Sequence, residues 1–152
     1  PRLLFTRRAA SLPHHQGQIA FPGGTVDPSD ADLRATALRE SEEEIGLAPA
    51  QVRILGALDD IETIVSRFVI TPYVGIVTPP YQWRPSPAEV DCIFTVGLDV
   101  LRDPATQRTE QREFEGLPVP IDLFDVDGHV IWGATHRITR NFLQIVAPAW
   151  GE

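Results

Sequence analysis

An acidic run at the end of a predicted helix places the strongest constraint on this chain. The run occupies residues 39–47 and reads Arg-Glu-Ser-Glu-Glu-Glu-Ile-Gly-Leu. At about 100° per residue, Glu40, Glu43 and Glu44 lie within an arc of roughly 100° on one helix face. Leu38 and Ile45 point to the opposite side, where we expect them to pack on the core.

Three carboxylates at this end of a helix need a compensating charge. Like charges three and four residues apart repel one another, and the C-terminal end of a helix disfavours anions because of the helix dipole. A divalent cation would compensate, and Mg²⁺ or Mn²⁺ prefers carboxylate oxygens. Arg39 lies one turn before Glu43 and can orient it, whereas Glu42 faces away from the other glutamates. The alternative is an acidic face that is merely solvated.

The rest of the chain predicts short strands and a second helix. The acidic helix is expected to begin with Ser29 or Asp30 as N-cap and to end at Gly46. Apolar residues at helical spacing predict the second helix at residues 133–146. The expected strands cover residues 3–6, 18–21, 52–58, 67–77, 90–96 and 117–130, the last folded around a turn at residues 125–128. This order indicates an α+β or α/β class with a mixed sheet.

Length and composition indicate one domain that spans residues 1–152 and exclude several classes of protein. No apolar run approaches the roughly 20 residues of a membrane span. Cys92 is the single cysteine, which excludes a disulfide framework, and the net charge of −8 argues against a general nucleic-acid binder. We expect a cytoplasmic protein. The absence of Met favours an internal piece of a longer protein or a sequence from which methionines are missing.

The acidic helix and the glycine before it resemble a known family signature. Gly24, followed by Arg39-Glu40-x-x-Glu43-Glu44-x-Gly46-Leu47, resembles the signature of the Nudix hydrolases. The resemblance implies a loop–helix–loop that binds divalent metal through its glutamates, in an α/β/α sandwich with a mixed sheet. Ser41 stands where an aliphatic residue is usual, and the spacer after Gly24 is one residue longer than in the general form.

A second resemblance concerns the residues before this signature. Residues 4–24 resemble the motif that precedes the Nudix signature in coenzyme A diphosphatases, and Trp132-Gly133-x-Thr135 resembles their closing segment. The resemblance implies hydrolysis of coenzyme A or acyl-CoA to 3′,5′-ADP and 4′-phosphopantetheine or its acyl form. The alternatives are another nucleoside diphosphate derivative, such as ADP-ribose, NADH or a dinucleoside polyphosphate, and a non-catalytic Nudix-fold module that binds a ligand.

The resemblance also implies which carboxylates would act in catalysis. Glu40, Glu43 and Glu44 would hold Mg²⁺ or Mn²⁺, and Glu40 and Glu43 would take part in catalysis directly. Glu43 is one candidate for the general base. Glu89, which lies outside the signature, is the other, because Nudix enzymes often recruit a carboxylate from elsewhere in the chain.

Four further residues are candidates for substrate binding. Arginine forks suit phosphate oxygens, and Arg8 is expected to bind the 3′-phosphate of coenzyme A, with Arg7 as a surface charge or ion pair. His15 contacts substrate phosphate or anchors its loop. Gly24 forms a tight turn that lets the backbone approach the metal site. Arg39 is the fourth candidate for substrate binding.

Overall fold

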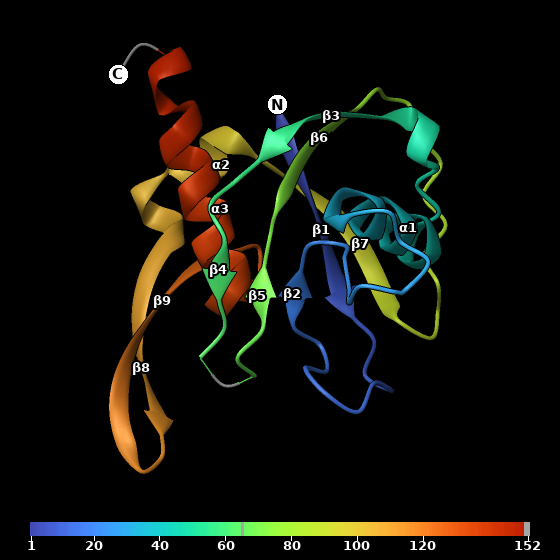
Figure 1. The fold of residues 1–152 in the computed structure, drawn as a ribbon. Coiled ribbons are helices and arrows are strands. Elements are labelled where there is room, and N and C mark those ends of the chain that lie inside the picture. Colours follow the sequence, from blue (N-terminus) through green and yellow to red (C-terminus); the bar gives the residue numbers. More distant parts are fainter. Residues whose placement is uncertain (65, 151–152) are drawn as a thin grey trace.

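The structure is a computed structural model that describes residues 1–64 and 66–150, and its strands form small antiparallel sheets beside three helices (Figure 1). Within the described residues, three short 3₁₀ segments lie between or after them, at Pro49–Gln51, Pro104–Thr106 and Ala147–Trp150. The strands are β1 (Arg2–Arg8), β2 (Ile19–Ala20), β3 (Val52–Ala57), β4 (Ile61–Glu62), β5 (Val69–Ile70), β6 (Tyr73–Val77), β7 (Val90–Gly97), β8 (Gln107–Phe114), β9 (Leu117–Val126) and β10 (His129–Trp132). The helices are α1 (Leu33–Ile45), α2 (Leu98–Arg102) and α3 (Gly133–Val146).

The strand order separates into two three-stranded sheets, β2-β1-β7 and β10-β9-β8, and the pairs β3-β6 and β4-β5. The α+β class is as expected, but every pairing within the described residues is antiparallel, so the parallel pairing of a mixed sheet is not among them. β10 lies beside β2, yet β2 is only two residues long. Pro22, which has no N–H, and the glycines that follow it end β2 before a ladder to β10 can form.

Two apolar clusters hold the sheets and helices together. In the first, the ring of Phe5 stacks on Phe21 at 4.9 Å and on Phe94 at 5.6 Å. Strands β2, β7, β9 and β10 and helix α2 supply the other buried side chains, and α3 packs against them. In the second, Ile45 at the end of α1 packs with Leu47 and Val90. The second cluster fixes the end of the acidic helix against β7.

Both ends of α1 are capped, but the N-cap differs from the one expected. The residue is Asp32 rather than Ser29 or Asp30, and its Oδ1 accepts the N–H of Ala35 at 2.7 Å. Gly46 takes the left-handed conformation at φ 70°, and its N–H donates to the carbonyl of Glu42, so the predicted C-terminal end is confirmed.

Outside α1, the main features that the sequence did not predict are short or exposed elements. The expected strand at residues 67–77 is divided into β5 and β6 around Pro72, whose carbonyl accepts the N–H of Leu58. Strand β8 has almost no buried side chain, so it carries no alternation of apolar and polar residues. Helix α3 and the turn before β10 lie where the sequence predicted them.

Candidate active site

Arg39, near the middle of α1, organises the loop before the helix and two of its glutamates. Its Nε and Nη2 donate to the two carboxylate oxygens of Asp30 at 2.8 and 2.9 Å. Nη1 donates to Glu40 at 3.0 Å and to Glu43 at 3.2 Å, and Nη2 also donates to the carbonyl of Thr25. Arg39 thus orients Glu43, as expected, and its donors are occupied by the protein. A direct contact between Arg39 and substrate stays a prediction.

Asp30 is the site residue whose role the sequence reasoning missed. Hydrogen bonds from Arg39 hold the pKa of this carboxyl well below its usual range, and the contact raises the pKa of Arg39 in turn. The N–H of Asp27 and the hydroxyl of Thr36 donate to the same carboxylate at 2.8 Å. Asp30 is therefore the ionised anchor of the loop that leads into α1. In the sequence, its place next to the predicted helix start was what drew attention to it.

The glutamates of α1 differ sharply in their surroundings. Glu44 is buried, and its Oε2 accepts the N–H of Gly23 at 3.3 Å. The side chain of Glu40 is 15% exposed and that of Glu43 is 53% exposed. Glu42 is exposed and makes no side-chain hydrogen bond among the described residues. The face assignment separates Glu42 correctly, but it does not foresee that Glu44 lies deepest.

Burial shifts the pKa of Glu44 in the opposite direction from that of Asp30. Desolvation raises the pKa of Glu44 to about 7, and the charges of Glu89 and Glu40 act in the same direction. The N–H of Gly23 and the charge of Arg8 act against them. Residues far apart in sequence therefore act electrostatically on one carboxylate, because β1 and β7 bring Arg8 and Glu89 toward α1. An electrostatic interaction of this kind indicates a functional site.

Gly24 is required for the close approach of its loop to α1. A Cβ at this position would overlap with the carboxylate of Glu40. A larger residue at this position would displace the Glu40 carboxylate from the place where it accepts a hydrogen bond from Arg39. The geometry agrees with the tight backbone approach that the sequence predicted.

A register shift in β1 gives Arg7 and Arg8 different environments. Arg7 lies opposite Cys92 on β7, but Arg8 lies opposite Val90 because of a bulge between the two arginines. Arg7 forms an ion pair with Asp91 at 2.6 Å, which matches its expected role as a surface charge. The Nε of Arg8 is buried and has no hydrogen-bond partner among the described residues. Arg8 therefore carries an unused donor close enough to influence Glu44.

Glu89 and His15 lie on the loops that flank Arg8. The carbonyl of Glu89 accepts the N–H of Ala9 at 2.9 Å, which ties the start of β7 to the end of β1. His15 has a positive φ of 57°, is exposed, and shares a hydrogen bond of 3.1 Å with the side chain of Gln18. This geometry agrees with a loop anchor, and a contact between His15 and substrate stays a prediction.

The carboxylates suit a hard divalent cation in chemistry, although they are not assembled around one. Within residues 1–64 and 66–150, no three His, Cys, Asp or Glu side chains are already arranged to hold a metal ion. Glu40 and Glu43 instead accept from Arg39. The buried Glu44, with two other glutamates acting on its pKa, is the group that a cation would stabilise most. The residues fit a metal site that forms by rotation of glutamate side chains.

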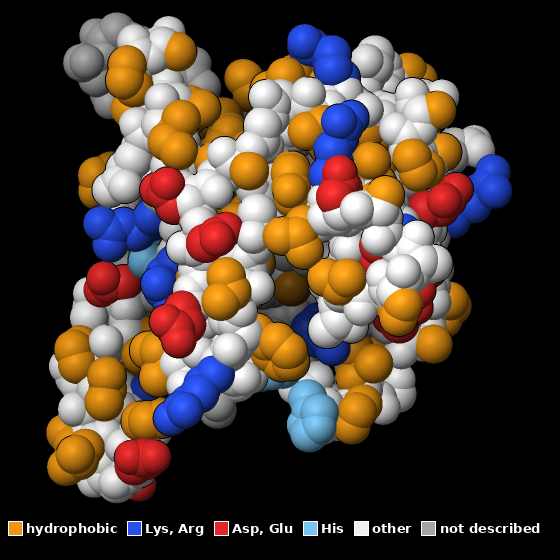
Figure 2. All heavy atoms as spheres, viewed as in Figure 1, with side chains coloured by type: hydrophobic (Ala, Val, Ile, Leu, Met, Phe, Trp, Pro, Cys, Tyr) orange, Lys and Arg blue, Asp and Glu red, His pale blue; other side chains and the backbone are white. Residues whose placement is uncertain are grey.

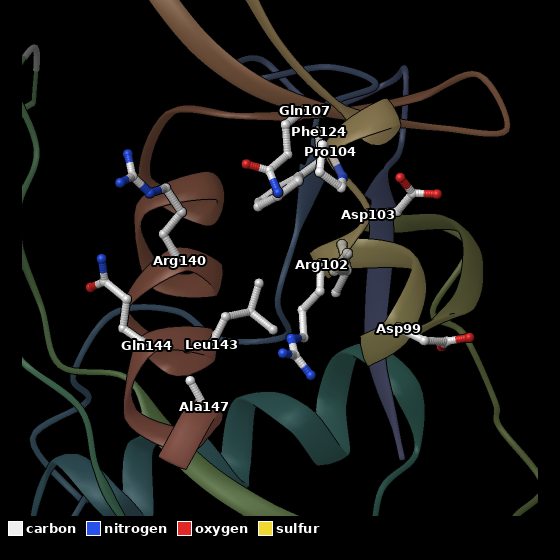
Figure 3. A pocket seen from close by; sticks show the side chains of 11 residues that line it. Asp99, Arg102, Asp103, Pro104, Gln107, Phe124, Arg140, Leu143, Gln144 and Ala147 are labelled. Carbon is white, nitrogen blue, oxygen red and sulfur yellow. The ribbon is translucent and has the colours of Figure 1, made fainter. Parts of the chain in front are cut away.

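A cavity of about 710 Å³ lies elsewhere, between α2 and α3 (Figure 3). Asp99 and Asp103 line it together with Arg102 and Arg140, so its charges are of both signs. No glutamate of α1 contributes to it. The acidic site is therefore separate from this cavity.

Two segments from different ends of the chain, residues 4–24 and 132–135, meet beside β2. The hydroxyl of Thr135, at the start of α3, donates to the carbonyl of Ile19 at 3.0 Å, and Thr135 is buried. The segment at residues 132–135 thus packs against the end of the segment at residues 4–24. Both belong to the framework that positions Arg8 and the glycines.

Comparison with known proteins agrees with this fold. A solved structure of a C. elegans Ap4A hydrolase in a binary complex superimposes with a TM-score of 0.54 at 22% identity, over 64% of this chain and 70% of that one. The family model described as "NUDIX domain" matches residues 1–127 of this chain. Proteins named "Uncharacterized Nudix hydrolase NudL" from Salmonella paratyphi B and Salmonella newport are 37% identical over 95% of this chain and 76% of theirs.

The chain belongs to the NUDIX domain family. It is a pyrophosphohydrolase, and enzymes of this family generally need a divalent metal ion and act on small nucleotide substrates. No helix among the described residues is long and apolar enough to cross a membrane.

The pKa of Glu44 predicts how the stability of the metal-free protein depends on pH. Its folded pKa of about 7 exceeds its ordinary 4.5, so the cost of ionising it is absent well below pH 4.5 and complete above pH 7. Glu44→Gln removes this cost. We expect it to raise the free energy of unfolding by about 1–3 kcal/mol at pH 8 and by much less at pH 5.

Denaturant unfolding with chelator present measures this effect at both pH values. Glu42→Gln is the matched control, because Glu42 is an exposed glutamate on the same helix. An equal effect of Glu44→Gln at pH 5 and pH 8 would contradict the argument, since a penalty on the charged form must vary with pH.

Proposed function

We propose that the protein hydrolyses the diphosphate bond of coenzyme A or acyl-CoA, giving 3′,5′-ADP and 4′-phosphopantetheine or its acyl form, with Mg²⁺ or Mn²⁺ as cofactor. The observation that carries the proposal is the buried, unpartnered Nε of Arg8. Arg8 belongs to the segment that resembles the coenzyme A diphosphatases, and its charge acts on Glu44 of the glutamate helix. A buried cationic donor beside clustered carboxylates suits a substrate that bridges the two with phosphate oxygens.

Glu40, Glu43 and Glu44 would hold the divalent ion, after the first two turn away from Arg39. Such an ion neutralises charge on the diphosphate oxygens and lowers the pKa of water. Arg8 would donate its free Nε–H to a phosphate oxygen. Arg39 stays paired with Asp30 and fixes the helix face that carries the glutamates.

Two carboxylates are candidates for the proton acceptor. Glu43 is the most exposed of the three glutamates, so a water molecule can reach its oxygens. Glu89 lies near Glu44, as its effect on the pKa of Glu44 requires. Either carboxylate could take a proton from the attacking water directly, and no covalent intermediate on the protein is required.

Substitutions of the α1 glutamates should differ in how much they lower kcat. We expect Glu40→Gln, Glu43→Gln and Glu44→Gln each to lower kcat by about 10² or more, the scale of losing a key electrostatic group. Glu42→Gln should leave kcat nearly unchanged. Chelator should abolish activity and added Mg²⁺ or Mn²⁺ should restore it, as followed by phosphate-ester product formation. A Glu42→Gln enzyme as damaged as Glu43→Gln would show that the helix face is wrongly assigned.

A substrate panel with product masses tests the choice of substrate. With Mg²⁺ or Mn²⁺ present, coenzyme A should have a higher kcat/KM than ADP-ribose, NADH or Ap4A, and its products should have the masses of 3′,5′-ADP and 4′-phosphopantetheine. The other three compounds represent the alternative substrates of the family. Equal rates for all four would remove the coenzyme A proposal and leave the broader activity.

The position of Arg8 changes what its substitution should do. Because Arg8 acts on Glu44, we propose that it binds the diphosphate beside the glutamates, rather than the 3′-phosphate that the sequence reasoning assigned to it. Arg8→Ala should then lower kcat/KM about 10- to 100-fold for coenzyme A and dephospho-coenzyme A alike, the value of a charged hydrogen bond. Arg7→Ala is the control. A loss confined to coenzyme A would restore the 3′-phosphate assignment.

A further inference from the structure

Strand β8 is the exposed edge of an arm that extends away from the rest of the molecule (Figure 1). It pairs with β9 along residues 107–114, and β10-β9-β8 is the order of its sheet. Glu115 and Gly116 connect the two strands at φ values of 51° and 77°, as a two-residue hairpin turn with two positive φ angles requires. No strand among the described residues pairs with the outer edge of β8.

Two prolines show which backbone groups of β8 point outward. Pro118 lies opposite Glu113, and Pro120 lies opposite Gln111. Proline has no N–H to donate, so the pairs that it forms are those in which the backbone groups face away from the partner strand. The N–H and carbonyl groups of Thr109, Gln111 and Glu113 therefore point away from β9. The same prolines deny the outer edge of β9 two of its donors, whereas the edge of β8 has no proline.

We propose that β8 pairs antiparallel with β8 of a second copy of this chain, with the two-fold axis at Gln111. The inference does not depend on the identity of the substrate. Edge pairing requires the outward groups of the two strands to face each other, so Thr109, Gln111 and Glu113 must pair among themselves. That requirement leaves only registers centred on a residue.

The charges of β8 distinguish between those registers. Within one chain Glu110 and Arg112 form an ion pair at 3.5 Å. Centred on Gln111, each Glu110 lies opposite Arg112 of the second copy, so these two pairs can be exchanged for two ion pairs across the axis. Centred on Glu110, the two copies of Glu110 oppose each other and Arg108 opposes Arg112. Centred on Arg112, the arginines oppose each other.

A register centred on Thr109 also places Arg108 opposite Glu110, but in this register only residues 107–111 of the two strands face each other. The Gln111 register overlaps residues 108–114. Charged residues on an edge strand usually prevent pairing. Here they disfavour the registers centred on Glu110 and Arg112, and of the two registers that they match, the one centred on Gln111 pairs more residues.

The apolar end of the arm favours the same arrangement. Phe114 is 46% exposed and Leu117 is 66% exposed, and the space-filling view shows hydrophobic and acidic side chains at this end of the molecule (Figure 2). In the proposed register, Phe114 lies opposite Arg108 of the second copy, whose aliphatic stem can cover the ring. The chain carries a net charge of −8, so two copies repel at long range and local matching of this kind is needed.

Sedimentation of the full chain over a wide concentration range tests the proposal. We expect a reversible dimer. Glu110→Arg and Arg112→Glu each place like charges opposite one another in the homodimer, so each should raise the dimer Kd at least about tenfold. The two variants mixed together should associate again, since one then presents only arginines and the other only glutamates. The chain that carries both substitutions should also dimerise.

Gln111→Pro is the second, independent variant. It removes an N–H that points away from β9, so the hairpin keeps its own hydrogen bonds, as β9 does at Pro118 and Pro120. It should abolish the dimer without changing the melting temperature of a monomeric sample by more than a few degrees. The melting temperature also controls for Arg112→Glu, because the guanidinium of Arg112 lies 4.5 Å over the ring of Trp132.

Each other outcome would overturn the proposal. A chain that is monomeric at every concentration has no such interface. A dimer that survives Gln111→Pro is formed elsewhere. A dimer that either charge reversal breaks, but that the mixture of the two does not restore, has a different register.

Discussion

The two-point contact between Arg39 and Asp30 is the interaction on which the site depends. It links the middle of α1 to the loop before it, and the loop in turn brings Gly23 and Gly24 against the glutamates. Without this contact the loop would lose its main attachment to the helix, and Glu40 and Glu43 would lose the donor that orients them. The N-cap at Asp32 is a consequence of the same arrangement, because Asp30 is occupied by Arg39 and is not available to cap the helix.

A second constraint is the cost of keeping Glu44 away from water. The site places a buried carboxylate near two others and offsets it only with one backbone N–H and the charge of Arg8. This incomplete compensation makes the metal-free site unfavourable, and it is what a bound cation would correct. In the proposed metal site, the affinity for the ion and the instability of the empty site would thus have one physical origin.

Local signals in the sequence predicted much of this structure, and long-range contacts decided the rest. Gly46 ends α1 as predicted because a left-handed residue after a helix is a local preference of glycine. The predicted N-cap residue was wrong because Ser29, Asp30 and Asp32 are all good capping residues. The contact between Asp30 and Arg39, which leaves Asp32 to cap the helix, is not visible in the local sequence.

The site shows the same division between local and distant effects. The shared face of Glu40, Glu43 and Glu44 follows from helical spacing, but the burial of Glu44 depends on Gly23, from the loop after β2. The different environments of Arg7 and Arg8 depend on a bulge against β7. Strand β8 gave no apolar pattern because neither of its faces is buried. The resemblance of residues 4–24 and 39–47 to family motifs therefore supplies candidate residues, such as Arg8, that helical spacing alone does not predict.

Gly23 and Gly24 have a consequence for how such a site can acquire different substrates. They present only main-chain atoms to the glutamates, so this wall of the site offers the same surface to every nucleotide. Changing Gly24 to tune recognition would disturb a carboxylate of the site, because a Cβ at Gly24 overlaps with Glu40. Selectivity must then reside in side chains around the glutamates rather than in these two glycines, and Arg8 at the end of β1 is one whose charge already acts on Glu44.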